Sequence, residues 1–333
     1  MRPYATYQAQ LERVSRSFAL CIPQLAPPFR DHVALAYLLL RVLDTVEDAP
    51  FADRIAQQAQ FERMRGFLRA PPAADAVAAF IAAFPDGLVE AERELLADSH
   101  ALLTDAHALP PAVKQPIFAA IDRMGEGMAA YARRPVPFQL VDLEDVTRYC
   151  CFVAGLVGEM LTQLWRDANG VTGPALDLAY EFGVFLQKVN ILKDQHEDER
   201  AGKFFVPDRR ELLASLRGHA RAAIRYLQSL PTADRGYRTF CAWSLMLAAT
   251  TIGELDRPRA SRREDTVKLL QRTSQIIDDN DGLAALFGEL MPRLPDDPAR
   301  PRRTKPESLE WFTASLAAPL SPTELRRLGI ALP

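Results

Sequence analysis

The sequence predicts an all-α protein, and two observations support this fold class. Segments such as "DHVALAYLLLRVLDTVED" (residues 31–48) place apolar residues three or four positions apart, which is the spacing of one helix face. Turn signals such as "FPDG" and "NGVTGP" separate these segments, and no block shows the alternating pattern of a β-strand. Because the chain has 333 residues, of which 48% are hydrophobic, it is long enough to bury a large core. We expect one helical domain over residues 1–292, followed by a proline- and arginine-rich linker and short tail over residues 293–333.

Each expected helix is a segment with this periodicity that is bounded by Gly, Pro or polar turn residues. In chain order the segments are residues 31–48, 52–70, 88–109, 113–134, 145–165, 175–198 and 263–279. The uncharged stretch "TFCAWSLMLAATTIG" (residues 239–253) is shorter than the ~20 residues that a membrane span needs, so we interpret it as a buried core helix. The aspartates of "DDND" (residues 278–281) are interpreted as a helix end before Gly282, because Gly commonly terminates helices.

Composition and charge exclude several classes of protein. The net charge is −3, so there is no electrostatic case for a nucleic-acid partner. The four cysteines show no CxxC spacing, which favours free thiols in a reducing compartment, and the adjacent pair is interpreted as small buried apolar residues. The first residues lack the apolar core of a signal peptide. We therefore expect a cytoplasmic protein without a transmembrane helix. The cysteines are Cys21, Cys150, Cys151 and Cys241.

Two clusters of carboxylates interrupt the apolar pattern. In "LRVLDTVEDAP" (residues 40–50), three acidic residues occupy positions i, i+3 and i+4, so on a helix they share one face. The same spacing recurs in "QKVNILKDQHEDER" (residues 187–200), and basic residues flank both clusters. Like charges at this spacing repel, which indicates that a cationic ligand compensates them. The carboxylates are Asp44, Glu47 and Asp48 in the first cluster and Asp194, Glu197 and Asp198 in the second.

Paired carboxylate clusters on two helices are typical of metal-assisted ionisation of a diphosphate. Carboxylate oxygens suit Mg²⁺, which usually takes one or two carboxylates, several waters and substrate phosphate oxygens. Arginine and lysine would bind the remaining diphosphate oxygens, and metal and cations together would stabilise the leaving group. The allylic carbocation left behind needs a dry apolar chamber, which the apolar faces next to the clusters could supply. The alternative interpretation is that the clusters are two solvated helix ends.

Four ordered blocks of the chain resemble the signature blocks of the squalene/phytoene synthase family. They are "SRSFAL" (residues 15–20), "YLLLRVLDTVED" (37–48), "YCCFVAGLVGEML" (149–161) and "FLQKVNILKDQHEDERAGKFFVP" (185–207). The order and spacing agree with that family across about residues 10–250. The third block resembles the squalene-forming members more than the phytoene-forming ones.

The resemblance implies a class I isoprenoid synthase fold, a helical bundle around a central apolar cavity. It also implies a Mg²⁺-dependent farnesyltransferase, with Mn²⁺ as an alternative ion, that joins two farnesyl diphosphates head to head. Presqualene diphosphate would form first, and NADPH would then deliver hydride to give squalene, a sterol or hopanoid precursor. The expected partner is the small-molecule substrate, with peripheral membrane contact for product release and no set oligomeric state.

The resemblance also assigns roles to individual residues. It implies the metal ligands Asp44, Glu47, Asp48, Asp194 and Asp198. It implies that the diphosphate is bound by Ser15, Arg16, Phe18, Arg41, Gln187, Asn190, Lys193 and Lys203. Tyr37 and Tyr149 would be polar residues of the chamber, and Tyr149 would handle the proton that is lost when the cyclopropane closes. The segment thought to hold NADPH would contribute Lys268 and Arg272.

The chain departs from the family pattern at several of these positions. Lys193 and Lys203 stand where eukaryotic members usually have arginine, which keeps the charge but loses the bidentate fork. Phe205 replaces a usual tryptophan, and the tail "SPTELRRLGIALP" is too short and too charged to be the membrane helix that ends eukaryotic members. Around Lys268 the chain reads "VKLLQRTS", with leucines where a further basic residue is expected.

Two alternatives to squalene formation remain open. The first is a relative that does not use NADPH and ends at presqualene diphosphate, hydroxysqualene or dehydrosqualene. The second is a non-catalytic helical protein that binds isoprenoid diphosphate. A missing metal aspartate would be typical of the second, and no such aspartate is missing here.

Overall fold

The computed structural model describes residues 1–15, 17–134, 137–255 and 263–296. Over these ranges almost all regular structure is helical, which confirms the expected all-α class. The helices are α1 (Tyr4–Val14), α2 (Phe18–Cys21), η1 (Ile22–Gln24), α3 (Phe29–Asp48), α4 (Arg54–Gly66), α5 (Ala74–Ala82), α6 (Glu90–Ala97), α7 (Ser99–His107), α8 (Pro111–Ala132), α9 (Leu143–Cys150), η2 (Cys151–Gly155), α10 (Leu156–Asn169), α11 (Leu176–Arg200), α12 (Arg209–Ser229), α13 (Arg235–Glu254), α14 (Arg263–Gln275) and α15 (Asn280–Leu290). The strands are β1 (Phe138–Gln139) and β2 (Lys203–Phe204).

The chain divides into two compact units. Unit 1 comprises Met1–Arg134 and Gln163–Asn169, and unit 2 comprises the described residues of Pro135–Thr162 and Gly170–Pro333. The expected boundary between a domain at residues 1–292 and a tail at 293–333 stays a prediction, since residues 297–333 lie outside the described ranges. In the part of the chain that the structure describes, no helix is both long and apolar enough to cross a membrane.

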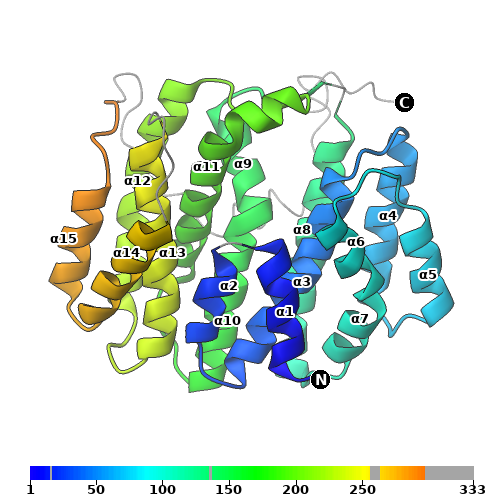
Figure 1. Cartoon of the computed structure of the whole chain (residues 1–333), viewed down its shortest axis with the longest axis horizontal. Helices are drawn as coiled ribbons and strands as arrows, with labels where there is room; N and C mark the ends of the chain where they lie inside the picture. The colour runs from blue at the N-terminus through cyan, green and yellow to red at the C-terminus, as the bar shows by residue number, and fades with distance from the viewer. Residues whose placement is uncertain (16, 135–136, 256–262, 297–333) are drawn as a thin grey trace. The chain divides into compact units, whose positions relative to one another are not determined.

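Unit 1 is organised around α3, which is packed by α1, α4, α6, α7 and α8 (Figure 1). The run "VALAYLLL" explains this position, because nearly every residue of it is buried. Burial of such side chains contributes about 1.5–3 kcal/mol each to the stability of the fold. Thr45, which is also buried, donates a hydrogen bond from its hydroxyl to the carbonyl oxygen of Arg41 at 2.9 Å, so its polar group is satisfied inside the helix. From Val33 to the end of α3, the side chains that are not buried lie on one narrow face.

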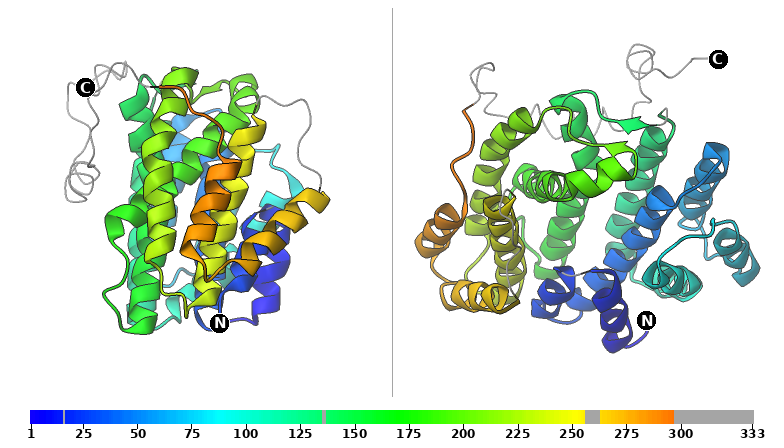
Figure 2. Two further views of the ribbon diagram at one scale, coloured as in Figure 1. Left: turned by 90° about the vertical axis from the view of Figure 1, so that its left-hand side faces the viewer. Right: turned by 45° about the horizontal axis from the view of Figure 1, so that its top comes forward.

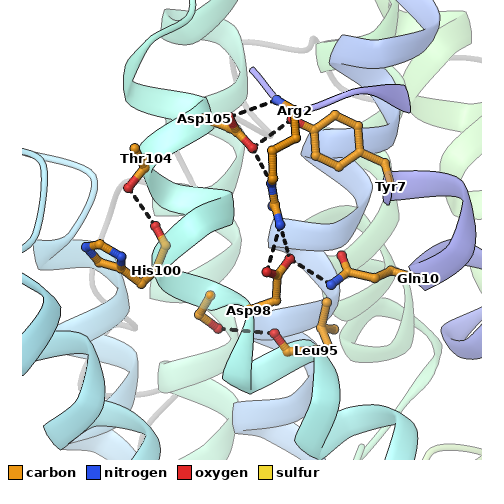
Figure 3. A network of polar contacts seen from close by, with 9 residues as sticks. Arg2, Tyr7, Gln10, Leu95, Asp98, His100, Thr104 and Asp105 are labelled. Carbon is orange, nitrogen blue, oxygen red and sulfur yellow. Dashed lines mark hydrogen bonds and ion pairs between the residues drawn. The ribbon is translucent and has the colours of Figure 1, made fainter. Parts of the chain in front are cut away.

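A polar network fixes the amino-terminal segment of unit 1 to α7 and its preceding turn (Figure 3). Arg2 donates from Nη1 to both carboxylate oxygens of Asp98 at 2.7 Å, and from Nε to Asp105 at 2.6 Å. The hydroxyl of Tyr7 donates to Asp105 at 2.9 Å, and Gln10 donates to Asp98 at 2.7 Å. Both carboxylates are thus bound to charged and neutral donors at once, which holds α1 against the rest of unit 1.

Unit 2 is organised around α11, which packs against α9, η2, α12 and α13, while α13 also packs against α14 and α15 (Figures 1 and 2). Two glycines permit the closest of these approaches. A Cβ built at Gly158 would collide with the carbonyl oxygen of Ala179, and one built at Gly183 would collide with that of Ala154. The backbone of α11 therefore lies directly against the helical segment that follows Tyr149.

Strands β1 and β2 are a single parallel pair in unit 2, with Phe138 opposite Lys203 and Gln139 opposite Phe204. The amide of Leu140 extends the pairing by donating to the carbonyl oxygen of Phe204 at 3.0 Å. This pairing brings the segment before α9 beside the segment that follows α11.

Several expected elements differ in the structure. The segment 88–109 is two helices that meet at Asp98, whose carboxylate binds Arg2. The segment 145–165 is interrupted by the π-helical turn η2, a feature often found at functional sites. Helix α12 lies outside the expected segments. The core helix at residues 239–253 is confirmed by α13, whose central residues are buried.

The interpretation of "DDND" as a helix end was wrong. Gly282 lies in the first turn of α15, and Asp279 caps that helix by accepting hydrogen bonds from the amides of Asp281 and Gly282 at 3.0 Å. Aspartate is among the preferred residues for this position, so the cluster marks a helix start rather than a terminating glycine.

Candidate active site

The first acidic cluster lies on a polar stripe of α3 in unit 1. Tyr37, Arg41, Asp44 and Asp48 are spaced three or four residues apart, so they follow one face of the helix. The stripe is half-buried up to Asp44 and exposed at Asp48, whereas the residues between its members are mostly buried. Glu47 lies beside the end of the stripe. The predicted first metal motif is thus part of one continuous polar surface that runs from a tyrosine to a carboxylate pair.

Arg41 and Asp44 form the centre of this stripe. The guanidinium donates from Nη1 to Oδ2 of Asp44 at 2.8 Å, and the two side chains are 25% and 27% exposed. The Nε of Arg41 is buried and has no hydrogen-bond partner among the residues that the structure describes. A buried unsatisfied donor on a charged group is costly, so this N–H is suited to an acceptor that the protein does not itself supply.

Desolvation shapes the ionisation of the same stripe. Burial raises the pKa of Asp44, the neighbouring charge of Asp48 acts in the same direction, and the Arg41 guanidinium opposes both. Burial also raises the pKa of Tyr37, although a hydrogen bond with Ser15 and the charge of Arg41 partly offset it. The Asp44 carboxylate therefore benefits from any added cation, because a cation favours its charged form.

The block "SRSF" meets the stripe at Tyr37. The ring of Phe18 lies 5.3 Å from the ring of Tyr37, centroid to centroid, and the amide of Phe18 donates to the hydroxyl of Ser15 at 3.1 Å. Ser15 also bonds with Tyr37, as described above. The structure therefore brings Ser15, Phe18, Tyr37 and Arg41 together in unit 1. The predicted diphosphate ligand Arg16 lies outside the described residues.

The second acidic cluster lies near the carboxyl end of α11 in unit 2. Gln187, Asn190, Asp194 and Asp198 share one face of the helix, at intervals of three and four residues. Lys193 is exposed and forms an ion pair with Asp194 at 3.1 Å. His196 has an 84% exposed side chain, so it faces solvent beside the cluster. The two acidic clusters therefore lie in different units of the chain.

Tyr149 lies in an aromatic cluster of unit 2. Its ring is 5.2 Å from that of Phe205 and 6.5 Å from that of Phe138, and the two phenylalanine rings are 5.1 Å apart. Tyr149 is buried, and the β1–β2 pair holds both phenylalanine segments in place. Lys203, a predicted diphosphate ligand, stands opposite Phe138 in that pair and is partly buried.

Sequence reasoning missed Phe138. It lies in a short non-helical segment eleven positions before Tyr149, and no local pattern links the two. Only the pairing of β1 with β2 places it beside Tyr149, so a strand partner would have been the signal to find it.

The cysteines next to Tyr149 are not nucleophiles. Cys150 and Cys151 are fully buried free thiols, which confirms their interpretation as small core residues. Burial raises the pKa of Cys150 to about 12, and burial together with the charges of Cys150 and Glu181 raises that of Cys151 far above its ordinary value. Neither thiol is ionised at neutral pH, so neither can attack a substrate.

The carboxylate stripes fit Mg²⁺ by the chemistry of their donors. Carboxylate oxygens are the only strong metal ligands on the stripe of α3, and hard oxygen ligands suit Mg²⁺. Within the described residues, no three His, Cys, Asp or Glu side chains lie close enough together to hold a metal ion by themselves. A Mg²⁺ ion that takes two carboxylates would still need water and phosphate oxygens, which is its usual coordination.

The segment predicted to bind NADPH is helix α14. Lys268 and Arg272 are both exposed and lie four residues apart on one face. Arg272 donates to both carboxylate oxygens of Glu289, at 2.9 and 2.6 Å. Leu270 is buried, with 6% exposure, so an arginine at that position would place a charge in the core. Of the two predicted cofactor ligands on α14, Arg272 is therefore already paired with a carboxylate.

Comparisons with known proteins define first the class and then the family. The structure matches the complex of TcSQS with the ligand BPH1237 at a TM-score of 0.73 and 24% sequence identity. The match covers 98% of this chain and 98% of the TcSQS chain. A dehydrosqualene synthase in complex with a ligand matches 82% of this chain and 96% of the other, with a TM-score of 0.56 and 19% identity. The chain therefore has the helical fold of the isoprenoid synthases, as the sequence predicted.

The family follows from the sequence comparisons. The squalene/phytoene synthase model matches residues 11–210, and the chain belongs to that family. The chain is 33% identical over 276 residues to the squalene synthase of Eremothecium gossypii, which covers 73% of this chain and 60% of the relative. The chain thus spans about three-fifths of the length of the curated relatives that it matches.

Proposed function

We propose that the protein joins two farnesyl diphosphates head to head and reduces the resulting presqualene diphosphate to squalene. The observation that carries this proposal is the polar stripe of α3. There Arg41, beside the carboxylate of Asp44, has a buried N–H without a partner among the described residues. The similarity to squalene synthases supports the same reaction. The stripe suits a polyanion bound through cations, because it combines a guanidinium with carboxylates that need a metal.

In this proposal the two acidic clusters act on one substrate. Asp44, Glu47 and Asp48 from unit 1, with Asp194 and Asp198 from unit 2, would hold Mg²⁺. When bound, Mg²⁺ would neutralise the diphosphate and stabilise it as a leaving group.

The diphosphate oxygens that remain would accept hydrogen bonds from the basic and polar residues of both units. Arg41 has the donor geometry for this, because its Nε is unused while Nη1 is held by Asp44. Lys193 and Lys203 would add point charges, and Gln187 and Asn190 would orient substrate or water oxygens on the face of α11. Ser15, Arg16 and Phe18 would complete the site.

The aromatic cluster of unit 2 would handle the carbocation. Phe138 and Phe205 exclude water from the ring of Tyr149, and their faces can stabilise positive charge. The hydroxyl of Tyr149 would relay the proton lost on closure of the cyclopropane, giving its own proton to an oxygen of the released diphosphate as it accepts the new one. Tyr37 is the second phenol, and its raised pKa keeps it protonated and able to donate to the substrate diphosphate.

A second candidate function is release of an unreduced product. It is favoured by α14, where Arg272 is already paired with Glu289 and Leu270 occupies the core. NADPH would supply hydride to the presqualene-derived cation, with Lys268 and Arg272 binding its phosphate. With fewer free cations, that binding would be weaker, and presqualene diphosphate, hydroxysqualene or dehydrosqualene would be released instead.

Product analysis distinguishes the two functions. The purified protein is incubated with farnesyl diphosphate and Mg²⁺, and the products are separated by chromatography across a titration of NADPH. We expect presqualene diphosphate without NADPH and squalene with it. An identical product pattern at zero and saturating NADPH would exclude the reductive step and establish the second candidate.

A further inference from the structure

A buried charged network in unit 2 has no part in the mechanism above. Lys188 on α11 is only 1% exposed, and its ammonium group makes three hydrogen bonds. The acceptors are the hydroxyl of Thr147 on α9 at 2.8 Å, the hydroxyl of Ser215 on α12 at 3.1 Å, and Nε2 of His219 on α12 at 3.0 Å. The other ring nitrogen of His219, Nδ1, is hydrogen-bonded to the carboxylate of Glu181, which also lies on α11. Three helices therefore converge on one lysine.

Burial lowers the pKa of Lys188, and the nearby Cys150, Cys151 and Glu181 oppose that shift. With Lys188 as an ammonium, each hydrogen bond in this network has one direction. The hydroxyls of Thr147 and Ser215 donate to helix carbonyl oxygens, those of Leu143 and Leu212, each at 2.7 Å. A hydroxyl has only one proton to donate, so both must accept from Lys188. The ammonium likewise has no lone pair, so Nε2 of His219 accepts its third proton.

It follows that His219 is neutral and donates from Nδ1 to Glu181. Burial and the charge of Lys188 lower the pKa of His219, while Glu181 opposes them, which agrees with this assignment. Burial opposes ionisation of Glu181, but His219 and Lys188 lower its pKa overall. The network is therefore one positive and one negative charge joined through a neutral imidazole, with all three ammonium protons used.

The network connects the two chemical elements of unit 2. Thr147 lies two residues before Tyr149 on α9, and Lys188 lies six residues before Asp194 on α11. Six residues correspond to about 120° around a helix, so Lys188 lies on a different face from the carboxylates. The bond from Lys188 to Thr147 therefore ties the turn that carries Tyr149 to the helix that carries the second acidic cluster, without touching the substrate face.

We propose that Lys188 is a positioning residue. Held by His219 and Glu181, it fixes the turn of α9 that contains Tyr149 relative to the second acidic cluster, Asp194 and Asp198, on α11. This inference rests on the proposed function, because it assigns the network a role in the same reaction. Removal of one partner leaves the other charges of a buried network unsatisfied, whereas the intact network specifies one arrangement of its helices. Placement of the phenol against the metal site is the property that such an arrangement controls, and an error of about 1 Å costs about 100-fold in rate.

The kinetic test uses the full-length protein and the first half-reaction, measured without NADPH. We expect Lys188→Met to lower kcat by about 10- to 100-fold while KM for farnesyl diphosphate changes little, since Lys188 does not face the substrate. In the double variant Lys188→Met, Tyr149→Phe, kcat should be less than about twofold below that of Tyr149→Phe alone. The reason is that the phenol which Lys188 positions is already absent. A fully additive double variant, or an unchanged kcat in Lys188→Met, would overturn the inference.

Thr147 supplies a second pair of variants if Lys188→Met does not fold. Thr147→Val removes the hydroxyl that binds Lys188 and should reproduce the loss of kcat, whereas Thr147→Ser keeps the hydroxyl and should restore most of it. Equal rates for the valine and serine variants would overturn the inference. Tyr237→Phe is the matched control, since it breaks another buried hydrogen bond of unit 2, the 2.8 Å bond to Tyr226, outside this network. Its kcat should equal that of the wild type.

A measurement that does not depend on enzyme activity, the reaction rate of buried thiols, tests this inference separately from the proposed function. Cys150 and Cys151 follow Tyr149 directly and are buried, so their reaction with dithiobis(nitrobenzoate) reports the position of that turn. In a Cys21→Ser, Cys241→Ser background, Lys188→Met and Thr147→Val should both react at least about tenfold faster than Tyr237→Phe. Equal thiol rates would overturn the inference. If Tyr149→Phe left turnover intact, the proposed role of the phenol would fail, while the thiol rates would still test the network.

Discussion

The guanidinium of Arg41 donates one hydrogen bond to Asp44 at 2.8 Å, and its Nε is buried without an acceptor in the described part of the chain. The pair therefore combines a satisfied ion pair with an unused donor. An acceptor that binds there gains a charge-assisted hydrogen bond without breaking the ion pair, because different nitrogens serve each partner. This relationship distinguishes Arg41 from an arginine that only neutralises its neighbour.

Arg41→Lys should weaken binding of farnesyl diphosphate. Lysine keeps the charge but has no Nε donor in a planar fork. Loss of one hydrogen bond to a charged group corresponds to about 10- to 150-fold in affinity, measured as a rise in KM. Arg65→Lys is the control, because Arg65 pairs with Asp122 and Glu62 away from the stripe, and its KM should stay at the wild-type value. An unchanged KM in Arg41→Lys would show that Nε does not contact substrate.

Asp48→Asn and Asp194→Asn should each abolish turnover while the protein remains folded. Each change removes a charged ligand from the proposed metal site, which costs several kcal/mol of transition-state stabilisation, or at least about 100-fold in kcat. In metal-free buffer the melting temperature should not fall, because each change also relieves repulsion within its cluster. Asp122→Asn is the control for loss of a surface carboxylate. Near wild-type activity with Mg²⁺ in either variant would contradict the two-cluster site.

Tyr149→Phe should reduce formation of presqualene diphosphate more than Tyr37→Phe. If Tyr149 accepts the proton of cyclopropane closure, its loss costs about 10²–10⁴-fold in rate. Tyr37 contacts Phe18 and Ser15, so its loss should act mainly through KM. Single-turnover rates with saturating substrate separate the two effects. Equal and mild losses would leave Tyr149 as a packing residue of the aromatic cluster.

Glu289→Gln should improve the use of NADPH. The change releases Arg272, which now shares two hydrogen bonds with Glu289 on the surface of unit 2. Because the pair is exposed, we expect a modest fall of about two- to fivefold in the apparent KM for NADPH. The rate of the first half-reaction should not change. Glu264→Gln, which removes a charge from the first turn of the same helix, is the control. No difference between the two variants would exclude Arg272 as a cofactor ligand.

Gly158→Ala should destabilise the protein strongly. Its Cβ would meet the backbone carbonyl of Ala179, which cannot rotate away, so α11 would have to shift. We expect a loss of about 1–3 kcal/mol or more, visible as a lower melting temperature. Gly218→Ala is the matched control in the interior of α12, where a Cβ meets nothing within 4 Å. That change should stabilise by ~0.5–1 kcal/mol, because alanine is the better helix former.

Local spacing predicted much of the fold and part of the candidate site. The apolar period of residues 31–48 predicted α3, and the i, i+3, i+4 carboxylates predicted which of its faces would be polar. The same spacing in residues 187–200 predicted a carboxylate face on α11. These features depend only on residues within two helical turns of one another, so local sequence spacing is enough to predict them.

Features that depend on distant residues were not predictable in this way. Phe138 reaches Tyr149 only through the pairing of two-residue strands that are too short to show a pattern. Lys188 is a buried charge in a segment that predicts a simple apolar face, and its partners lie on α9 and α12. Tertiary contacts that join separate helices decide such positions, so single-helix periodicity does not reveal them.

The glycine contacts of α11 have a consequence for how this lineage can diverge. Every amino-acid replacement of a glycine codon adds at least a Cβ, and at Gly158 and Gly183 that atom would collide with a peptide carbonyl. At neither position, therefore, can a single-nucleotide change of the glycine codon give an amino acid that fits. We therefore expect substitutions in this helix pair to be tolerated on its other faces, so that new specificities arise from changes around the pair while the spacing of the two helices is kept.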